Sequence, residues 1–423
     1  MIMMHAANLK PHNNNPTAIF LWAVTGYVAL LALANFLQSE VLKTLSYTVS
    51  FAIFMLMAAI AAFLPDRKSL FVGLGFALNL YYYGIIGSTV YNIDHLDWSV
   101  TLKMLMGPLF VLFGASIEAQ SYALIWRNKY VKSLFMLLII LPSGLWIWQL
   151  VSGRAIFTSS AASTFGVSNE VSFFANRNSA AIYPLTLFTF YNVLSGKPVK
   201  NFLIYFFSGA IFKTLGVFFA TLISLMLTVA RDKSIKFGVL IIIAAIAILY
   251  VVNPTLSIIS RFTPVIDTFL LIVTGRIDLK TVSFGELVAT LHTTDLSFIF
   301  RLKHWLNLLD IYVNGSIFDW VFGFGTGSSV QMADIHLPPH NDYLRYLFEC
   351  GIVAFTGFVL LIGLIIFNCG RRWESVPFLA IIVYFFSENL IDNFVAMMVF
   401  YFCAGVLAQR IQTENLALRC QKV

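Results

Sequence analysis

The sequence predicts an all-α polytopic membrane protein with about twelve transmembrane helices and one large periplasmic loop between spans 9 and 10. Hydrophobic residues make up 59% of the 423 residues and charged residues only 11%, whereas a soluble domain carries roughly 25% charged residues. Apolar stretches of about 20 residues, enough to cross a hydrocarbon core of about 30 Å, recur along the chain. This composition argues against a secreted, disulfide-stapled or nucleic-acid-binding protein. The net charge of +7 is better explained as a signal of membrane topology.

Taken in order, the apolar stretches predict single spans near 17–37, 45–64, 69–90, 100–124, 132–151, 179–194, 237–252, 345–368, 376–391 and 394–409. The stretch 201–230 is too long for one untilted helix and has Lys213 and Gly216 in its middle. The positive-inside rule places both flanking basic residues, Lys200 and Arg231, in the cytoplasm. We therefore expect 201–230 to cross twice and turn near Lys213, which places both termini inside.

This topology divides the chain into three parts. Residues 1–252 hold spans 1–9, residues 253–344 form the periplasmic loop domain, and residues 345–423 hold spans 10–12 and a cytoplasmic tail. The segment 91–99 is a shorter outside loop. Only 253–344 is large enough to hold a site outside the membrane, so we expect the functional residues where this loop meets the helices.

His340 is the first candidate, in the run Pro338-Pro339-His340-Asn341-Asp342. Prolines favour the start of a helix, which places His340 at the mouth of a membrane span, near its positive dipole end. Arg345 and Glu349 follow on the same, otherwise apolar span, and ionisable residues at such depth are functional by default. The alternative is that His340 only caps the helix at the membrane interface.

Three outside cations are candidates for phosphate binding: Arg177, Lys213 and Arg301. A pyrophosphate leaving group gains charge in the transition state and needs fixed cations, and arginine suits bidentate phosphate contact. Two alternatives stay open. Arg301 could lie on the solvated face of a loop helix, and Lys213 could be a snorkelling anchor. The apolar face expected for the loop helix comprises Ile299, Leu302, Trp305, Leu306 and Leu309.

No metal or cofactor is expected. The glycine-rich run 323–328 lies outside the cytoplasm and follows no strand, so a tight turn bringing backbone near a ligand is favoured over a dinucleotide site. Prolines prevent the helix that a zinc pair of His336 and His340 would require. The four cysteines have no C-x-x-C spacing, and no Asp-x-Asp occurs. Glu388 and Asp392 either bind acceptor hydroxyls or cap the turn of the last hairpin.

The run Pro339-His340-Asn341-Asp342-Tyr343-Leu344, followed by Glu349-Cys350-Gly351, resembles the signature of the O-antigen ligase and Wzy-type polysaccharide polymerase superfamily. The glycine turn at 323–328, the Arg301 and Trp305 pair, and Asn176-Arg177-Asn178 are also similar to that family. The resemblance covers roughly 172–352. The chain departs from it at Lys213-Thr214, where members often carry Ser-Arg.

The resemblance implies a metal-independent, inverting glycosyltransferase of the bacterial inner membrane, with its site facing the periplasm. Its donor would be a glycan on undecaprenyl pyrophosphate. Its acceptor would be the lipid A core in a ligase of lipopolysaccharide biosynthesis, or another lipid-linked repeat unit in a polymerase. By this resemblance His340 takes the acceptor proton, and Arg177, Lys213 and Arg301 hold the pyrophosphate. Supporting roles fall to Asn341, Asp342, Arg345 and Glu349.

A twelve-span transporter is the competing prediction, because a short broken hairpin such as 201–230 is typical of transporter helices. Transporters keep their charges near the middle of the membrane, however, whereas here the charges gather at the outer interface. The predicted partners are therefore the lipid-linked donor, the glycan acceptor and membrane lipids, without nucleic acid.

Overall fold

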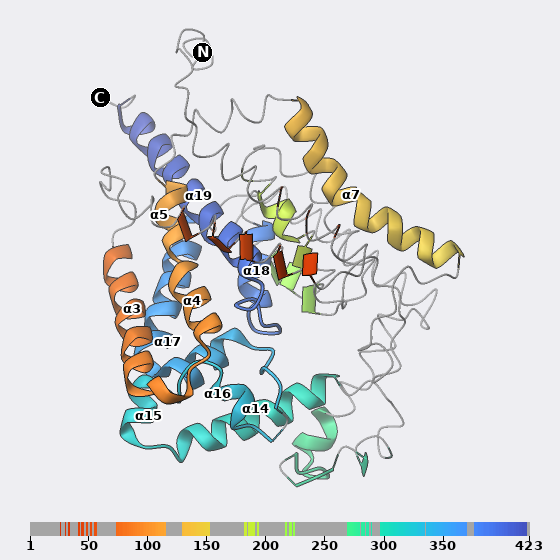
Figure 1. Ribbon diagram of the computed structural model, residues 1–423, viewed down its shortest axis with the longest axis vertical. Helices are drawn as coiled ribbons and strands as arrows, with labels where there is room; N and C mark the ends of the chain where they lie inside the picture. Colours follow the sequence, from red (N-terminus) through yellow and green to blue (C-terminus); the bar gives the residue numbers. More distant parts are fainter. Residues whose placement is uncertain are drawn as a thin grey trace.

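The fold is known from a computed structural model (Figure 1). It describes short runs between 26 and 56, 182 and 224, and 285 and 289, and residues 73–115, 129–152, 269–279, 281–283, 297–334, 336–369 and 376–420. All regular structure in these residues is helical, without a strand, which confirms the all-α prediction for this part of the chain. The predicted spans near 17–37, 45–64, 201–230 and 237–252 lie wholly or largely outside it.

Among the described residues, two stretches are long and apolar enough to cross a membrane, Trp98–Ala115 and Asp342–Asn368, and a shorter apolar helix covers Ala396–Ile411. The first stretch is two helices, α4 (Trp98–Met106) and α5 (Leu109–Ala115). They meet at Gly107-Pro108, where the proline ring removes a backbone donor. Helices α3 (Leu74–Tyr91) and α7 (Lys129–Ser152) coincide with the spans predicted near 69–90 and 132–151.

The last hairpin differs from the prediction. Helix α18 (Val376–Tyr384) ends at Tyr384 instead of running to residue 391. The chain then makes turns up to Asn393, where α19 (Phe394–Cys420) begins. The physical reason is a side chain: Asp342 Oδ2 accepts hydrogen bonds from the backbone N–H groups of Leu390 and Ile391 (2.6 and 3.3 Å), and so takes the place of helical carbonyl partners.

Helix α17 (Asp342–Cys369) is the centre of the bundle and lies along α3 (Figure 1). The two backbones are very close, because a Cβ on Gly84 would lie 2.3 Å from Ala354 N and a Cβ on Gly357 2.3 Å from Tyr81 N. Small residues at such crossings are typical of membrane helices. The buried Tyr81 hydroxyl, 2.7 Å from that of Tyr346, fixes α3 against the first turns of α17.

Three helices cross the end of the bundle where α3 ends and α17 begins: α14 (Ser297–Val313), α15 (Ile317–Phe322) and α16 (Ser328–Gln331) (Figure 1). Asp97 N donates to Thr326 O (2.8 Å), and Asn92 Nδ2 donates to Gly323 O (3.1 Å). Two segments predicted to lie on one side of the membrane, 91–99 and the later part of 253–344, therefore meet at one end of the helices.

Candidate functional site

Helix α17 is broken near its start by Gly351, which has φ 74° and ψ 179°. The carbonyls of Phe348 and Glu349 accept hydrogen bonds from the N–H groups of Phe324 and Gly325 (3.0 and 2.9 Å), so the break leaves these two carbonyls satisfied. A Cβ on Gly351 would lie 2.3 Å from Val321 O. The glycine turn thus packs against α17 on one side and against the 91–99 segment on the other.

His340 lies where predicted, immediately before the first turn of α17. Asn341 caps the helix, since its Oδ1 accepts a hydrogen bond from Leu344 N (3.1 Å), a typical N-cap contact. Helix α14 fixes the backbone just before His340, because its Trp305 Nε1 donates a hydrogen bond to Pro339 O (2.5 Å). The His340 backbone has φ 50°, an uncommon conformation for a residue other than glycine.

Glu388 connects the two main candidate residues. Its Oε2 lies 3.2 Å from His340 Nδ1, and its Oε1 lies 2.8 Å from Arg301 Nη2. The side chain of Glu388 is 9% exposed, compared with 29% for His340 and 22% for Arg301. The structure therefore brings together a histidine, a carboxylate and an arginine from the start of α17, the 385–393 turns and α14. The open alternative of a solvated face does not describe Arg301.

The carboxylate partner determines which imidazole nitrogen can act as a base. A carboxylate only accepts hydrogen bonds, so a neutral His340 carries its proton on Nδ1 and keeps the lone pair on Nε2. The Asn389 amide also lies beside Nδ1, with Nδ2 3.4 Å away, and its Oδ1 is buried without a partner among the described residues. The oxygen and nitrogen of an asparagine amide are assigned from their hydrogen bonds. With the Asn389 amide rotated by about 180°, Oδ1 would face the Nδ1 proton of His340 and accept it as a second hydrogen-bond partner.

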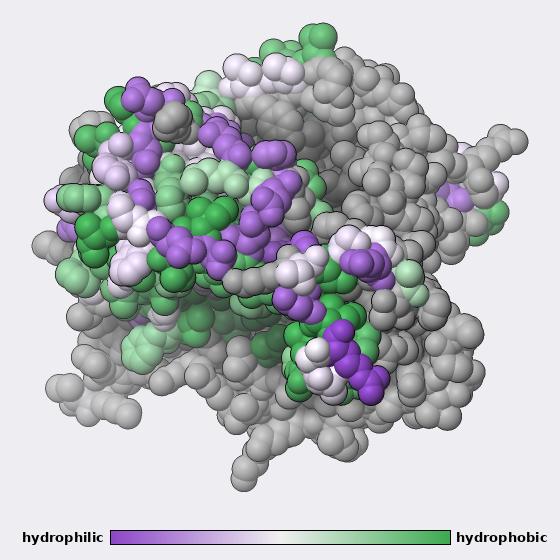
Figure 2. All heavy atoms as spheres, turned by 90° about the horizontal axis from the view of Figure 1, so that it is seen from below, coloured by the Kyte–Doolittle hydropathy of each residue, from purple (hydrophilic) through white to green (hydrophobic). Residues whose placement is uncertain are grey.

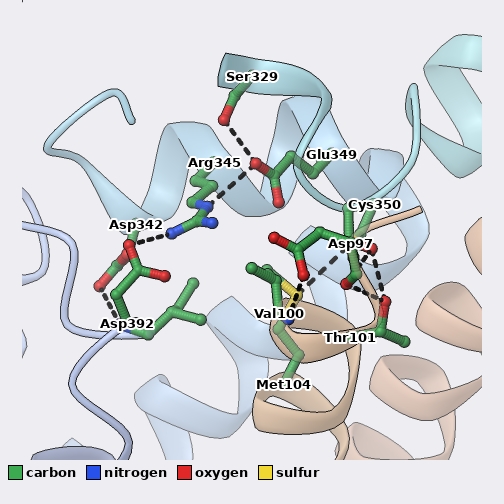
Figure 3. Close-up of polar contacts among 12 residues, drawn as sticks. Asp97, Val100, Thr101, Met104, Ser329, Asp342, Arg345, Glu349, Cys350 and Asp392 are labelled. Atoms are coloured by element: carbon green, nitrogen blue, oxygen red, sulfur yellow. Dashed lines mark hydrogen bonds and ion pairs between the residues drawn. The ribbon is translucent and has the colours of Figure 1, made fainter. Parts of the chain in front are cut away.

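Arg345 is the centre of a charge network that joins the first turns of α17 to the 385–393 turns (Figure 3). Arg345 Nε lies 3.0 Å from Glu349 Oε1, and Arg345 Nη1 lies 2.8 Å from Asp392 Oδ2. Ser329 Oγ is 2.5 Å from the same Glu349 oxygen. Only Asp392 is exposed; Arg345 and Glu349 are buried. Glu349 therefore pairs with Arg345, and the carboxylate beside the imidazole is Glu388.

The first turn of α17 also clamps the segment that carries Glu388. On one side of Glu388, Phe385 O accepts a hydrogen bond from Asp342 N (2.8 Å). On the other side, the Asp342 carboxylate holds the N–H groups of Leu390 and Ile391. The distance between Glu388 and His340 is therefore set by the backbone and side chain of Asp342. Asp342 therefore contacts the turn that carries Glu388, and its carboxylate does not contact the imidazole.

Helix α14 presents Arg301 as the sequence predicts, with one change in its apolar face. Ile299 is buried and Leu302, Trp305 and Leu306 are partly buried, but Leu309 is exposed and Leu308 is buried in its place. Arg177 and Lys213, the other two predicted cations, lie outside the described residues.

His304 lies on the same helix, between Arg301 and Leu308, and is buried. Its Nε2 donates to Leu337 O (2.8 Å), so Nδ1 carries no proton. Burial lowers the pKa of His304, and the neighbouring His340 lowers it further, against the Leu337 hydrogen bond and Asp334, which raise it. His304 is therefore a neutral, structural histidine beside the candidate base.

Within the described residues, no group of three or more His, Cys, Asp or Glu side chains could hold a metal ion. The imidazole of His336 contacts the backbone, with Nδ1 3.1 Å from Val330 O. The candidate site therefore consists of His340, Glu388 and Arg301. Scans against protein-family models and against curated proteins give no match for this chain.

Proposed function

We propose that the chain is an inner-membrane glycosyltransferase that moves a glycan from undecaprenyl pyrophosphate to an acceptor hydroxyl. The observation that carries this proposal is the shared carboxylate, Glu388, whose two oxygens contact the imidazole of His340 and the guanidinium of Arg301. A base and a phosphate-binding cation side by side are what a transfer with a pyrophosphate leaving group requires.

In the proposed reaction, His340 Nε2 takes the proton of the acceptor hydroxyl. The acceptor oxygen forms a bond to the anomeric carbon of the glycan, and the bond from that carbon to the pyrophosphate oxygen breaks with its electron pair. Glu388 stabilises the imidazolium that forms on His340, in the way that a buried carboxylate supports a catalytic histidine. A positioned base of this kind contributes roughly 10²–10⁴-fold to the rate.

Arg301 is proposed to bind the departing pyrophosphate. A guanidinium has five N–H donors in a planar fork, and the described contact with Glu388 uses Nη2, so donors remain for a phosphate oxygen. Arg177 and Lys213 are proposed as further cations of the same site. The charge left on the pyrophosphate is then neutralised by fixed residues, without a metal ion.

We propose O-antigen ligase as the activity, with the lipid A core as acceptor. Deletion of the gene, followed by gel electrophoresis of lipopolysaccharide, tests this assignment. A ligase deletion should remove every O-chain band and accumulate lipid-linked polymer. Survival of a band with a single repeat unit would identify a polymerase instead, and an unchanged pattern would contradict both.

A further inference from the structure

We propose that α15, the end of α14 and the end of α3 form an interfacial surface that lies against the boundary between phospholipid headgroups and acyl chains. The surface comprises Tyr91, Val313, Ile317, Phe318 and Trp320. The inference rests on the proposed insertion of α17 in a membrane but not on any catalytic role. It concerns how the loop helices sit relative to the lipid.

The surface is apolar and open to its surroundings. Ile317 is 63% exposed, Phe318 57% and Trp320 42%, although all three lie on one short helix. In the end-on view of Figure 2, hydrophilic residues form a band across the coloured face, and hydrophobic residues lie on both sides of this band. Exposed aromatic and aliphatic side chains at the end of a helix bundle are typical of the membrane–water interface.

The surface continues the outward face of α3. The ring of Tyr91 stacks on Phe318, with centroids 5.9 Å apart, and also lies near Phe322. Before Tyr91, the exposed apolar residues of α3 recur at helical spacing on one side, and they are Phe76, Tyr83, Ile86 and Val90. An apolar stripe along a helix that packs on the candidate span α17 thus leads directly to α15.

The depth of α15 along α17 fits the same boundary. Val321 of α15 lies against Gly351, which is about 13 Å from the start of α17 at 1.5 Å per residue. The apolar stretch Asp342–Asn368 has 27 residues and is therefore about 40 Å long, roughly 10 Å more than the hydrocarbon core. If the first turns of α17 take up this excess length, α15 lies where the core begins.

The polar groups around α15 are already satisfied within the loop. Trp320 Nε1 donates to Tyr312 O (2.7 Å), and the Tyr312 hydroxyl donates to Trp320 O (2.8 Å). Ser316 and Asp319 form a reciprocal capping box at the start of the helix. The helix therefore needs no water at these positions, and its apolar face can lie against acyl chains.

Nitroxide labels in the full chain, reconstituted in phosphatidylcholine vesicles, test the surface. Cysteine is introduced singly at Phe318, at Asn314 as the exposed polar control, and at Val359 as the lipid reference on α17. Cys369 and Cys420 are replaced by serine, and Cys350 and Cys403 are buried. The measurement is the ratio of collision rates with oxygen, which enters lipid, and with a water-soluble nickel chelate.

The Phe318 label should give a ratio several-fold above that at Asn314 and close to that at Val359. A Phe318 label as open to nickel chelate as Asn314, with Val359 still shielded, would overturn the interfacial surface alone. Chelate access at Val359 as well would contradict membrane insertion, and with it the proposed function. Two other outcomes would show that a second copy of the chain covers the surface instead. One is exclusion of both reagents at Phe318. The other is spin–spin broadening of the Phe318 label that disappears when the labelled protein is mixed with excess unlabelled protein.

Discussion

Glu388 contacts both candidate side chains, His340 and Arg301, so its charge should matter more for turnover than for donor binding. In Glu388→Gln the amide can still accept the Nδ1 proton of His340 but no longer stabilises an imidazolium. Loss of a charge-assisted contact worth roughly 1.5–3 kcal/mol should lower kcat about 10- to 150-fold. Donor KM should not rise, because Arg301 loses its competing carboxylate. Asp310→Asn on α14 is the matched control and should leave both constants unchanged, and a Glu388→Gln enzyme with normal kcat would remove Glu388 from the reaction.

His340 can be tested without disturbing its backbone. Asparagine tolerates positive φ better than alanine, so His340→Asn should fold with the φ of 50° intact. It supplies no base, and transfer should fall by roughly 10²–10⁴-fold. Binding of the pyrophosphate donor, measured by titration of the purified protein, should survive. Near-normal turnover would leave His340 as the interfacial cap of the alternative interpretation.

The buried His304 predicts how stability depends on pH. Its pKa is lowered in the folded protein, so the unfolded chain, with an ordinary histidine pKa of about 6.5, binds the extra proton first. The free energy of unfolding should therefore be highest above about pH 6.5 and fall as the pH drops below it. His304→Gln keeps a donor for Leu337 O and should flatten this dependence. The measurement is the thermal unfolding midpoint against pH in detergent, where identical slopes for both proteins would contradict the assignment.

Sequence reasoning identified His340 and Arg301 because each has a local pattern, a Pro-Pro-His-Asn helix start and an amphipathic helix. Glu388 has no such pattern. Its partners lie 48 and 87 residues away in the chain, and an acidic residue near the end of an apolar hairpin is as typical of a cap as of a site. The contacts of Glu388 with His340 and Arg301 are tertiary, and no spacing in the sequence encodes them.

At the scale of elements, the pairing of α17 with the 385–393 turns should dominate the stability of the site. Arg345→Met leaves Glu349 buried and uncompensated, and breaking a buried pair in this way costs roughly 3–5 kcal/mol. Asp392→Asn should cost much less, because Asp392 is 38% exposed. Thermal unfolding in detergent should rank the two variants in this order. An Arg345→Met protein as stable as wild type would show that the charge network of Arg345, Glu349 and Asp392 is not needed for the fold.

The break in α17 and the early end of α18 could not be predicted, for a shared reason. Glycine is common in membrane helices, so Gly351 carries no local sign of a break, and 376–391 is apolar enough for a continuous helix. Both interruptions depend on partners from elsewhere, the N–H groups of the 323–325 turn and the carboxylate of Asp342. Helix positions follow from hydropathy, whereas helix interruptions follow from tertiary hydrogen bonds.

At the scale of the whole molecule, the predicted topology is testable by labelling. Cysteine at Asn314, an exposed position before α15, should react with a membrane-impermeant maleimide added outside intact spheroplasts. Cysteine at Ser234, which lies outside the described residues, should react only after permeabilisation. Labelling at Ser234 in intact spheroplasts would contradict the crossing of 201–230 as two spans, and with it the total of about twelve.

The charge network of Arg345, Glu349 and Asp392 also sets an order of events during biosynthesis. Asp392 follows Arg345 by 47 residues, and chains are made from the N-terminus, so α17 is synthesised before its partner exists. Arg345 is in the first turn of α17, and Glu349, one turn later on the same helix, can pair with its charge meanwhile. The arrival of 385–393 then supplies Asp392 to Arg345 and Glu388 to His340 in one step. The candidate site would therefore stay incomplete until the last hairpin is in place.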